Sequence, residues 1–221
     1  MLINEFIIKE AKNANKYFSI DYHKRTRKSI FGLVESYRKN PTLNTLQKLI
    51  FEIFIWGNYT RTAGRFRDLE TDCKLKCHLL KSITQDKFET FNKLDFNDVE
   101  PVFKTFKVQL KIHGVDTSFF TKIIYFCAPK EQREVKGFLI LDKILDDNAK
   151  KLAEEVSDKL YLCAPTTITA RKYEMYCSFM VRMSAKYSKV CGTKLLPDEL
   201  EAIMFKYNHQ EGKANCRLHL R

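Results

Sequence analysis

Two apolar helical patterns are joined by a very short turn in Leu110-Lys-Ile-His-Gly-Val-Asp-Thr-Ser-Phe-Phe-Thr-Lys-Ile-Ile-Tyr-Phe126. A tight connection between helices usually needs one residue at positive φ, and Gly114 supplies it. Farther along, Phe138-Leu-Ile-Leu-Asp142 brings a single carboxylate out of an apolar run. An aspartate in that position commonly caps the helix that follows. We therefore expect a helical hairpin, followed by a helix that begins near Asp142.

Apolar residues recur at helical spacing in one segment after another, so the pattern predicts an all-α fold. We expect one helical domain spanning 1–221, bilobal in shape, with a helix-hairpin-helix element at 99–127. A charged connection at 128–137 is interpreted as a loop. The expected helices cover about residues 2–18, 30–40, 42–57, 68–82, 87–94, 99–110, 118–127, 142–156, 173–187 and 200–207.

The charge balance favours a polyanionic partner. The chain has 39 Lys and Arg against 27 Asp and Glu, a formal charge of +12 and a pI near 9.3, which makes nucleic acid the first candidate. No apolar run approaches the ~20 residues of a membrane span, and charge interrupts the N-terminal residues too early for a signal peptide. We expect an intracellular, cytoplasmic monomer without a membrane partner, associated with the nucleoid if the source is bacterial.

The cysteines are odd in number and scattered, which is typical of reduced thiols. Among the seven, Cys73 and Cys77 lie beside His78 at helical spacing, without a second ligand pair. We therefore expect no metal and no other cofactor.

The hairpin offers backbone amides that can meet a phosphate, and the start of the helix after it favours an anion. An ordinary helical hairpin explains the same residues. A polar loop ahead of it adds three arginines for phosphate contacts. The candidates for contact with a nucleic-acid backbone are His113, Gly114, Val115, Asp116, Thr117, Ser118, Arg61, Arg65 and Arg67.

The helix after the turn has two faces. Phe119, Phe120, Ile123, Ile124 and Cys127 form an apolar face, and polar side chains follow the other at i, i+3, i+4 and i+7. That polar stripe consists of Ser118, Thr121, Lys122 and Tyr125. A solvated helix face accounts for it equally well. For Asp142, the alternative to a functional role is a plain N-cap.

Together these elements resemble the helix-hairpin-helix DNA glycosylase superfamily. In that family a hairpin of the form Leu-x-x-x-Gly-Val-x-x-x precedes an apolar segment that ends in an essential aspartate. The matching residues are Leu110 to Ser118 and Phe138 to Asp142, and the resemblance is closest over 99–156. The stretch 196–205 is similar to the end of small glycosylases with the 8-oxoguanine glycosylase fold.

The resemblance also shows departures. Ser118 stands where bifunctional members carry the Schiff-base lysine, which favours simple hydrolysis. Lys122 lies one turn farther along the same face, where a desolvated amine could attack C1′ or hydrogen-bond the base. Asp116 stands where the second hairpin glycine is expected.

The resemblance implies that Asp142 stabilises positive charge on the sugar as the base leaves and assists the attacking water or amine. The enzyme must extrude the nucleotide, because its glycosidic bond cannot be reached inside a duplex. Aromatic side chains are then needed to stack on the base or wedge into the duplex. The candidates are Trp56, Tyr59, Phe66 and Tyr125.

The leading hypothesis is thus a DNA N-glycosylase for a damaged or modified base in double-stranded DNA. An oxidised purine such as 8-oxoguanine is the first choice, and lyase activity at abasic sites stays open. One alternative is a non-catalytic DNA-binding protein of the same fold, in which Asp142 only caps its helix. Others are a glycosylase for modified cytosine in viral DNA and a helical protein-interaction module.

Overall fold

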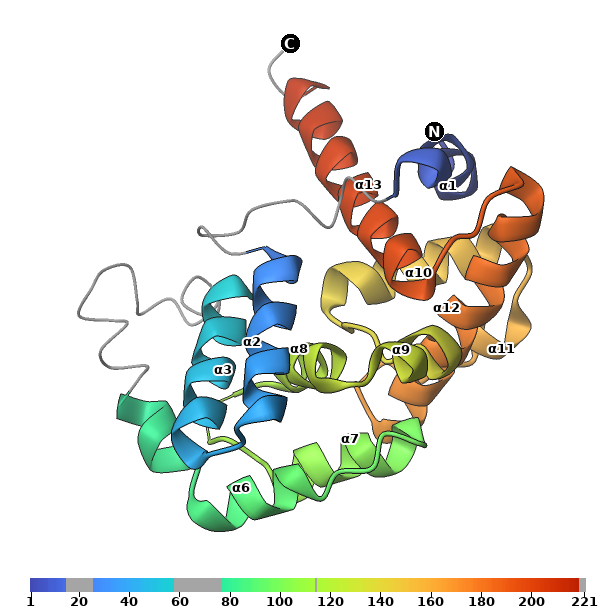
Figure 1. Ribbon diagram of the computed structural model, residues 1–221. Coiled ribbons are helices and arrows are strands. Elements are labelled where there is room, and N and C mark those ends of the chain that lie inside the picture. Colours follow the sequence, from blue (N-terminus) through green and yellow to red (C-terminus); the bar gives the residue numbers. More distant parts are fainter. Residues whose placement is uncertain (15–25, 58–76, 114, 219–221) are drawn as a thin grey trace. The chain divides into compact units, whose positions relative to one another are not determined.

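The computed structural model describes residues 1–14, 26–57, 77–113 and 115–218, with the backbone alone for 208–218. Every regular element in these ranges is a helix, so the predicted all-α fold is confirmed. The chain divides into two compact units. Unit 1 comprises Met1–Phe18 and Pro129–Arg221, and unit 2 comprises Ser19–Ala128. Figure 1 labels the helices of both units.

Unit 2 contains the two helices that the sequence predicts on either side of Gly114. Threonines cap two of its helices: the Thr26 hydroxyl accepts from the Ser29 amide, and the Thr42 hydroxyl accepts from the Thr45 amide. The helices are α2 (Arg27–Lys39), α3 (Leu43–Trp56), a segment at 77–82, α6 (Gln85–Asn92), α7 (Val99–Val108) and α8 (Thr117–Cys127).

Helix α8 forms the centre of unit 2. It packs against α2, α3 and α7 (Figure 1), and every residue from Phe119 to Cys127 is buried. The reading of its polar stripe as a solvated face is wrong, because Thr121 and Tyr125 are fully buried and Lys122 is only 8 % exposed. A helix with neighbours on several sides places its polar side chains in the interior as well.

Unit 1 is built around α10 and α12. Helix α10 packs against α1, α11 and α13, and α12 packs against α1, α9, α11 and α13. The Ile3 and Asn4 amides at the start of α1 donate to the Glu155 carboxylate over 3.0 and 2.8 Å. The helices of unit 1 are α1 (Ile3–Glu10), α9 (Lys130–Lys136), α10 (Lys143–Glu155), α11 (Lys159–Leu162), α12 (Ala170–Cys191) and α13 (Pro197–Leu218).

The structure differs from the sequence expectation in three places. The connection at 128–137 is not a loop, because α9 forms there from charged residues with good helix propensity and ends at Gly137 in the left-handed region. Helix α1 ends at Glu10 and continues as a 3₁₀ turn over 11–14. The short α11 was not predicted. Of the helix expected at 68–82, only 77–82 lies within the described residues.

Within the described ranges, every helix is too short or too polar to span a lipid bilayer.

Candidate active site

Asp142 is the N-cap of α10, as the sequence predicts. Its Oδ1 accepts a hydrogen bond from the Leu145 amide over 3.0 Å, and the side chain is half-buried. Among the described residues, nothing else is hydrogen-bonded to this carboxylate. One oxygen is therefore fixed by the helix, and Oδ2 is available to a ligand.

The carboxylate one turn farther along α10 has different surroundings. Asp146 accepts from Lys172 over 2.7 Å and from Tyr161 over 2.9 Å, and it lies 3.2 Å from the Lys150 ammonium. Burial pushes the pKa of Asp146 upward, but the hydrogen bonds from Lys172, Tyr161 and Lys150 outweigh it and lower the pKa. Asp146 is thus a structural ion-pair partner, and Asp142 is the better candidate for contact with substrate.

The chain ahead of Asp142 is extended and buried. Phe138, Leu139, Ile140 and Leu141 are between 0 and 2 % exposed. Side chains of α12 and α13 bind its backbone: Ile140 N–H donates to Glu201 Oε1 over 2.6 Å, and Tyr173 Oη donates to the Leu139 carbonyl over 2.7 Å. Sequence reasoning missed Glu201 and Tyr173, since they look like ordinary members of helical patterns.

Lys122 lies on α8 in unit 2. Its Nζ is 4.6 Å from the centre of the Phe119 ring, which lies one turn earlier. A Cβ added to Gly57 would come within 2.8 Å of Lys122 Cδ and 3.2 Å of Lys122 Cε, so the absence of a side chain at Gly57 leaves room for the lysine stem. The amine is held by close packing in the interior of its unit.

The hairpin between α7 and α8 is held by side chains from the preceding helices. Lys87 Nζ donates to the Lys111 carbonyl over 2.5 Å and to the Ser82 carbonyl over 2.8 Å. His78 Nε2 lies 2.8 Å from the His113 carbonyl oxygen, which can only accept. These contacts anchor the backbone on the α7 side of the turn. Gly114 lies outside the described residues.

On the other side of the turn, several amides already have acceptors. Val115 N–H donates to the Ile112 carbonyl over 3.2 Å. Asp116 Oδ1 accepts from the amides of Ser118 and Phe119 over 2.9 and 3.2 Å and from the Ser118 hydroxyl. Asp116 thus caps α8 and places its own carboxylate where a phosphate would otherwise approach. The exposed His113 and the half-exposed Thr117 remain accessible at this turn.

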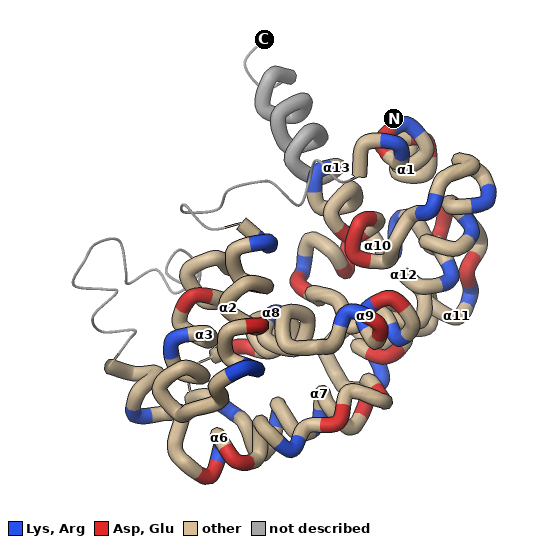
Figure 2. Tube along the Cα trace, in the orientation of Figure 1, with Lys and Arg blue, Asp and Glu red and all other residues tan. Residues whose placement is uncertain are grey.

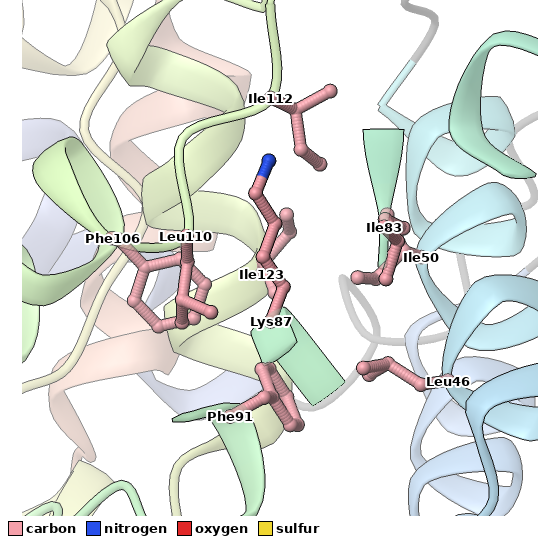
Figure 3. Close-up of a pocket in the computed structure, with 9 residues that line it drawn as sticks. All are labelled: Leu46, Ile50, Ile83, Lys87, Phe91, Phe106, Leu110, Ile112 and Ile123. Carbon is pink, nitrogen blue, oxygen red and sulfur yellow. The ribbon is translucent and has the colours of Figure 1, made fainter. Parts of the chain in front are cut away.

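A small cavity lies beneath the hairpin (Figure 3). Its lining is apolar except for Lys87, whose pKa burial lowers. Leu110 and Ile112 project into it from the hairpin and face Phe91 and Ile50. A pocket that recognises a base needs several placed polar groups, so this cavity belongs to the packing that supports the hairpin.

Two of the aromatic candidates surround a buried arginine. Arg27 Nη1 donates to Tyr125 Oη over 2.9 Å, and the guanidinium carbon lies 5.0 Å from the Tyr125 ring centre and 5.7 Å from the Trp56 ring centre. Trp56 and Tyr125 are 7 % and 0 % exposed. Both rings therefore pack within unit 2, and sequence reasoning missed Arg27. Their role against a base stays a prediction.

The remaining candidates, Tyr59, Phe66, Arg61, Arg65 and Arg67, lie outside the described residues. Along the described helices, acidic and basic residues are mixed in both units (Figure 2).

The glycosylase resemblance predicts a pair of helices, then an apolar segment that ends in an aspartate at the start of a further helix, and α7, α8, residues 138–142 and α10 follow this order. A family model described as "Putative 8-oxoguanine DNA glycosylase OGG-like protein" matches residues 9–205. The match covers most of the chain, so the chain belongs to this OGG-like family. The resemblance seen in the sequence is thereby confirmed. Searches of curated proteins and of solved structures gave no match.

Membership of this family suggests DNA glycosylase activity and implies DNA binding.

Proposed function

We propose that this protein is a DNA N-glycosylase that removes a damaged or modified base from duplex DNA. The observation that carries the proposal is the state of Asp142: helix α10 fixes one carboxylate oxygen, and the other has no hydrogen-bond partner among the described residues. The family description points to 8-oxoguanine as the first base to test.

The chemistry requires the target nucleotide to leave the helical stack, because the C1′–N bond is inaccessible inside a duplex. As that bond breaks, its electron pair leaves with the base, which takes up a proton, and positive charge develops on the sugar. A carboxylate held beside the sugar stabilises this charge and accepts the proton of the water that adds to C1′. Asp142 has this role in our proposal.

Two roles are open to Lys122, and each follows from its buried amine. As a neutral nucleophile it would form a bond to C1′ in place of water. The sugar ring would then open to an imine, and loss of a C2′ proton would expel the 3′ phosphate, as in lyase chemistry. As a cation it would instead hydrogen-bond the extruded base. Ser118, in the family's usual lysine position, favours hydrolysis without strand cleavage.

The proposed DNA contacts come from the hairpin and from the polar stretch of sequence that contains Arg61, Arg65 and Arg67. His113 and Thr117 are accessible at the described part of the turn, beside the exposed Asp116 and the partly exposed Ser118. The capping carboxylate of Asp116 opposes a phosphate at the start of α8, so it weakens the case for direct amide contacts there. Contacts through Arg61, Arg65 and Arg67, and a wedge formed by Tyr59 or Phe66, stay part of the proposal.

The test uses duplex oligonucleotides that each carry one altered base: 8-oxoguanine, uracil, an alkylated purine or a modified cytosine. Alkali after incubation cleaves the strand wherever a base has been removed. We expect cleavage at 8-oxoguanine that disappears in Asp142→Asn. Cleavage at modified cytosine alone would change the assigned base. DNA binding that weakens with salt, without any abasic product, would identify a non-catalytic binding protein instead.

A second measurement tests whether Lys122 is the nucleophile. Strand scission without alkali, together with an adduct trapped by borohydride, would establish lyase chemistry. The adduct should disappear in Lys122→Gln and persist in Lys107→Gln, a matched change at an exposed lysine of α7. An adduct that survives in Lys122→Gln excludes Lys122 as the nucleophile.

A further inference from the structure

The extended segment that leads into Asp142 presents a hydrogen-bonding problem. Residues 138–141 are almost completely buried, and no strand pairs with them among the described elements. Buried amides and carbonyls need partners, which a sheet or a helix would ordinarily supply. Here Glu201 of α13 accepts from Ile140 N–H over 2.6 Å, and Tyr173 of α12 donates to the Leu139 carbonyl over 2.7 Å. We name these two hydrogen bonds the 139–140 clamp.

The clamp uses side chains that are costly to bury. Glu201 and Tyr173 are both 0 % exposed, and burying a carboxylate or a hydroxyl costs free energy that apolar side chains would not. The pKa of Tyr173 is raised well above its ordinary value, first by burial and then by nearby Cys177 and Glu201, so the hydroxyl keeps the proton that it donates. The two polar side chains come from two different helices, and together they hold the backbone of two successive residues, Leu139 and Ile140.

We propose that Glu201 and Tyr173 are positioning residues that set the Asp142 carboxylate for base release. This inference rests on the function proposed above. Only Leu141, itself fully buried, separates the clamp from Asp142, and the bond to the Leu145 amide fixes the carboxylate from the other side. A shift of about 1 Å in a catalytic group can cost roughly 10²-fold in rate. A short rigid link from the clamp to the carboxylate prevents such a shift of Asp142.

Tyr173→Phe tests the clamp by removing a single hydroxyl, and Tyr187→Phe is its matched control. Tyr187 lies on the same helix, is 1 % exposed, and its hydroxyl donates to Asn4 Oδ1 over 2.6 Å. Each variant loses a tyrosine hydroxyl that donates a hydrogen bond, which is buried at Tyr173 and part-buried at Tyr187, and each should lose roughly 1–2 kcal/mol of stability. Only Tyr173→Phe should slow single-turnover base release, by about 10- to 100-fold, with the Kd for substrate DNA unchanged.

Glu201 is tested by a conservative and a drastic variant. Glu201→Gln keeps an acceptor oxygen for Ile140 N–H and should keep most of the rate. Glu201→Leu removes the acceptor and should lower the rate as Tyr173→Phe does. A Glu201→Leu variant that does not fold leaves the decision to the tyrosine pair.

An activity-independent measurement separates failure of the clamp from failure of the proposed function. Amide hydrogen exchange over residues 138–142 should be faster in Tyr173→Phe than in Tyr187→Phe. Equal exchange and equal rates in the two variants would overturn the inference. A wild-type protein that releases no base from the panel would refute the proposed function, and exchange alone would then show whether the clamp holds this segment.

Discussion

Two helices of this protein begin at an aspartate, α8 at Asp116 in unit 2 and α10 at Asp142 in unit 1. Each carboxylate accepts hydrogen bonds through Oδ1 from backbone amides of the first helical turn, two at Asp116 and one at Asp142. Asp116 is exposed, and its hydrogen bonds stay within three residues. Asp142 is half-buried. The backbone ahead of it, at Leu139 and Ile140, is held by Tyr173 and Glu201, which lie 34 and 61 positions farther along the chain.

An N-cap is defined by local hydrogen bonds, whereas a positioned carboxylate also depends on the long-range contacts of the backbone that leads into it. Capping alone would give both aspartates the same role. The backbone ahead of Asp116 also has distant partners, His78 and Lys87, but both are partly exposed. Only Asp142 combines a buried, held preceding segment with a half-buried carboxylate whose Oδ2 the described residues leave unengaged.

The largest expected effect comes from changing each aspartate to asparagine. Asparagine caps helices about as well as aspartate, so both variants should stay within about 1 kcal/mol of the wild-type free energy of unfolding. Asp142→Asn removes the charge that stabilises the sugar cation and should slow base release roughly 10²- to 10³-fold. Asp116→Asn should change that rate less than about threefold, since neutralising its carboxylate only eases the approach of a phosphate. Single-turnover kinetics and urea unfolding measure both effects; equal rate losses would remove the distinction between the two caps.

The next effect concerns the ion pair that supports the first turns of α10. Lys172→Met breaks the buried pair with Asp146 and should destabilise the protein by about 3 kcal/mol, because the carboxylate stays buried without its closest cation. Lys143→Met is the matched control. It breaks the exposed pair with Asp147 on the same helix and should cost less than about 1 kcal/mol. Urea unfolding at neutral pH compares the two; similar losses would show that the buried pair adds nothing special.

The same pair predicts a pH dependence. The pKa of Asp146 is lowered from its ordinary 3.8 in the folded protein. Its ionised form therefore favours the folded state above about pH 3.8, and the contribution shrinks as the pH falls below that value. Asp146→Asn has no carboxylate to titrate, so the stability gap between wild type and Asp146→Asn should narrow steadily below about pH 4. A gap that stays constant down to pH 2.5 would contradict the assignment.

Short-range and long-range features of this chain differ in how well its sequence predicts them. The hairpin helices and the Asp142 cap were predicted because short-range signals carry them, namely an apolar stripe and a capping residue. Helix α9 was missed because its charged residues form no apolar stripe. The partners of Tyr125 and Ile140 lie 98 and 61 positions away, so no local window could have indicated that Arg27 or Glu201 is buried.

A smaller effect is expected where the buried segment ahead of Asp142 begins. Gly137 and Gly192 both lie in the left-handed region, with φ of 65° and 63°, so alanine at either should cost about 1 kcal/mol. A Cβ at Gly137 would also come within 2.8 Å of the Cys177 carbonyl oxygen, whereas Gly192 faces open space. We expect Gly137→Ala to lose about 2–3 kcal/mol of stability and to slow base release, and Gly192→Ala to leave the rate unchanged. Equal stability losses in thermal unfolding would show that the segment has room to shift.

The smallest effect concerns Lys122, the candidate group on α8. Packing around its own side chain positions its amine, whereas Asp142 is positioned through the backbone ahead of it. Gly57 has φ −72° and ψ 1°, which alanine adopts readily, but its Cβ would press on Lys122 Cδ at 2.8 Å and Phe119 Cε1 at 2.9 Å. Both atoms lie toward the ends of their side chains, so the stability loss should stay below about 1 kcal/mol while the amine shifts.

Borohydride trapping, or base release if the wild type forms no adduct, should therefore fall several-fold in Gly57→Ala. The control is Gly32→Ala in the interior of α2, where a Cβ meets nothing within 4 Å. Alanine there should stabilise the helix by about 0.5–1 kcal/mol and leave trapping unchanged. If Gly57→Ala traps as well as wild type, Lys122 acts from a position that does not depend on its packing against Gly57. Helices α8 and α10 would then share an aspartate N-cap, but surrounding contacts would position the candidate group only on α10.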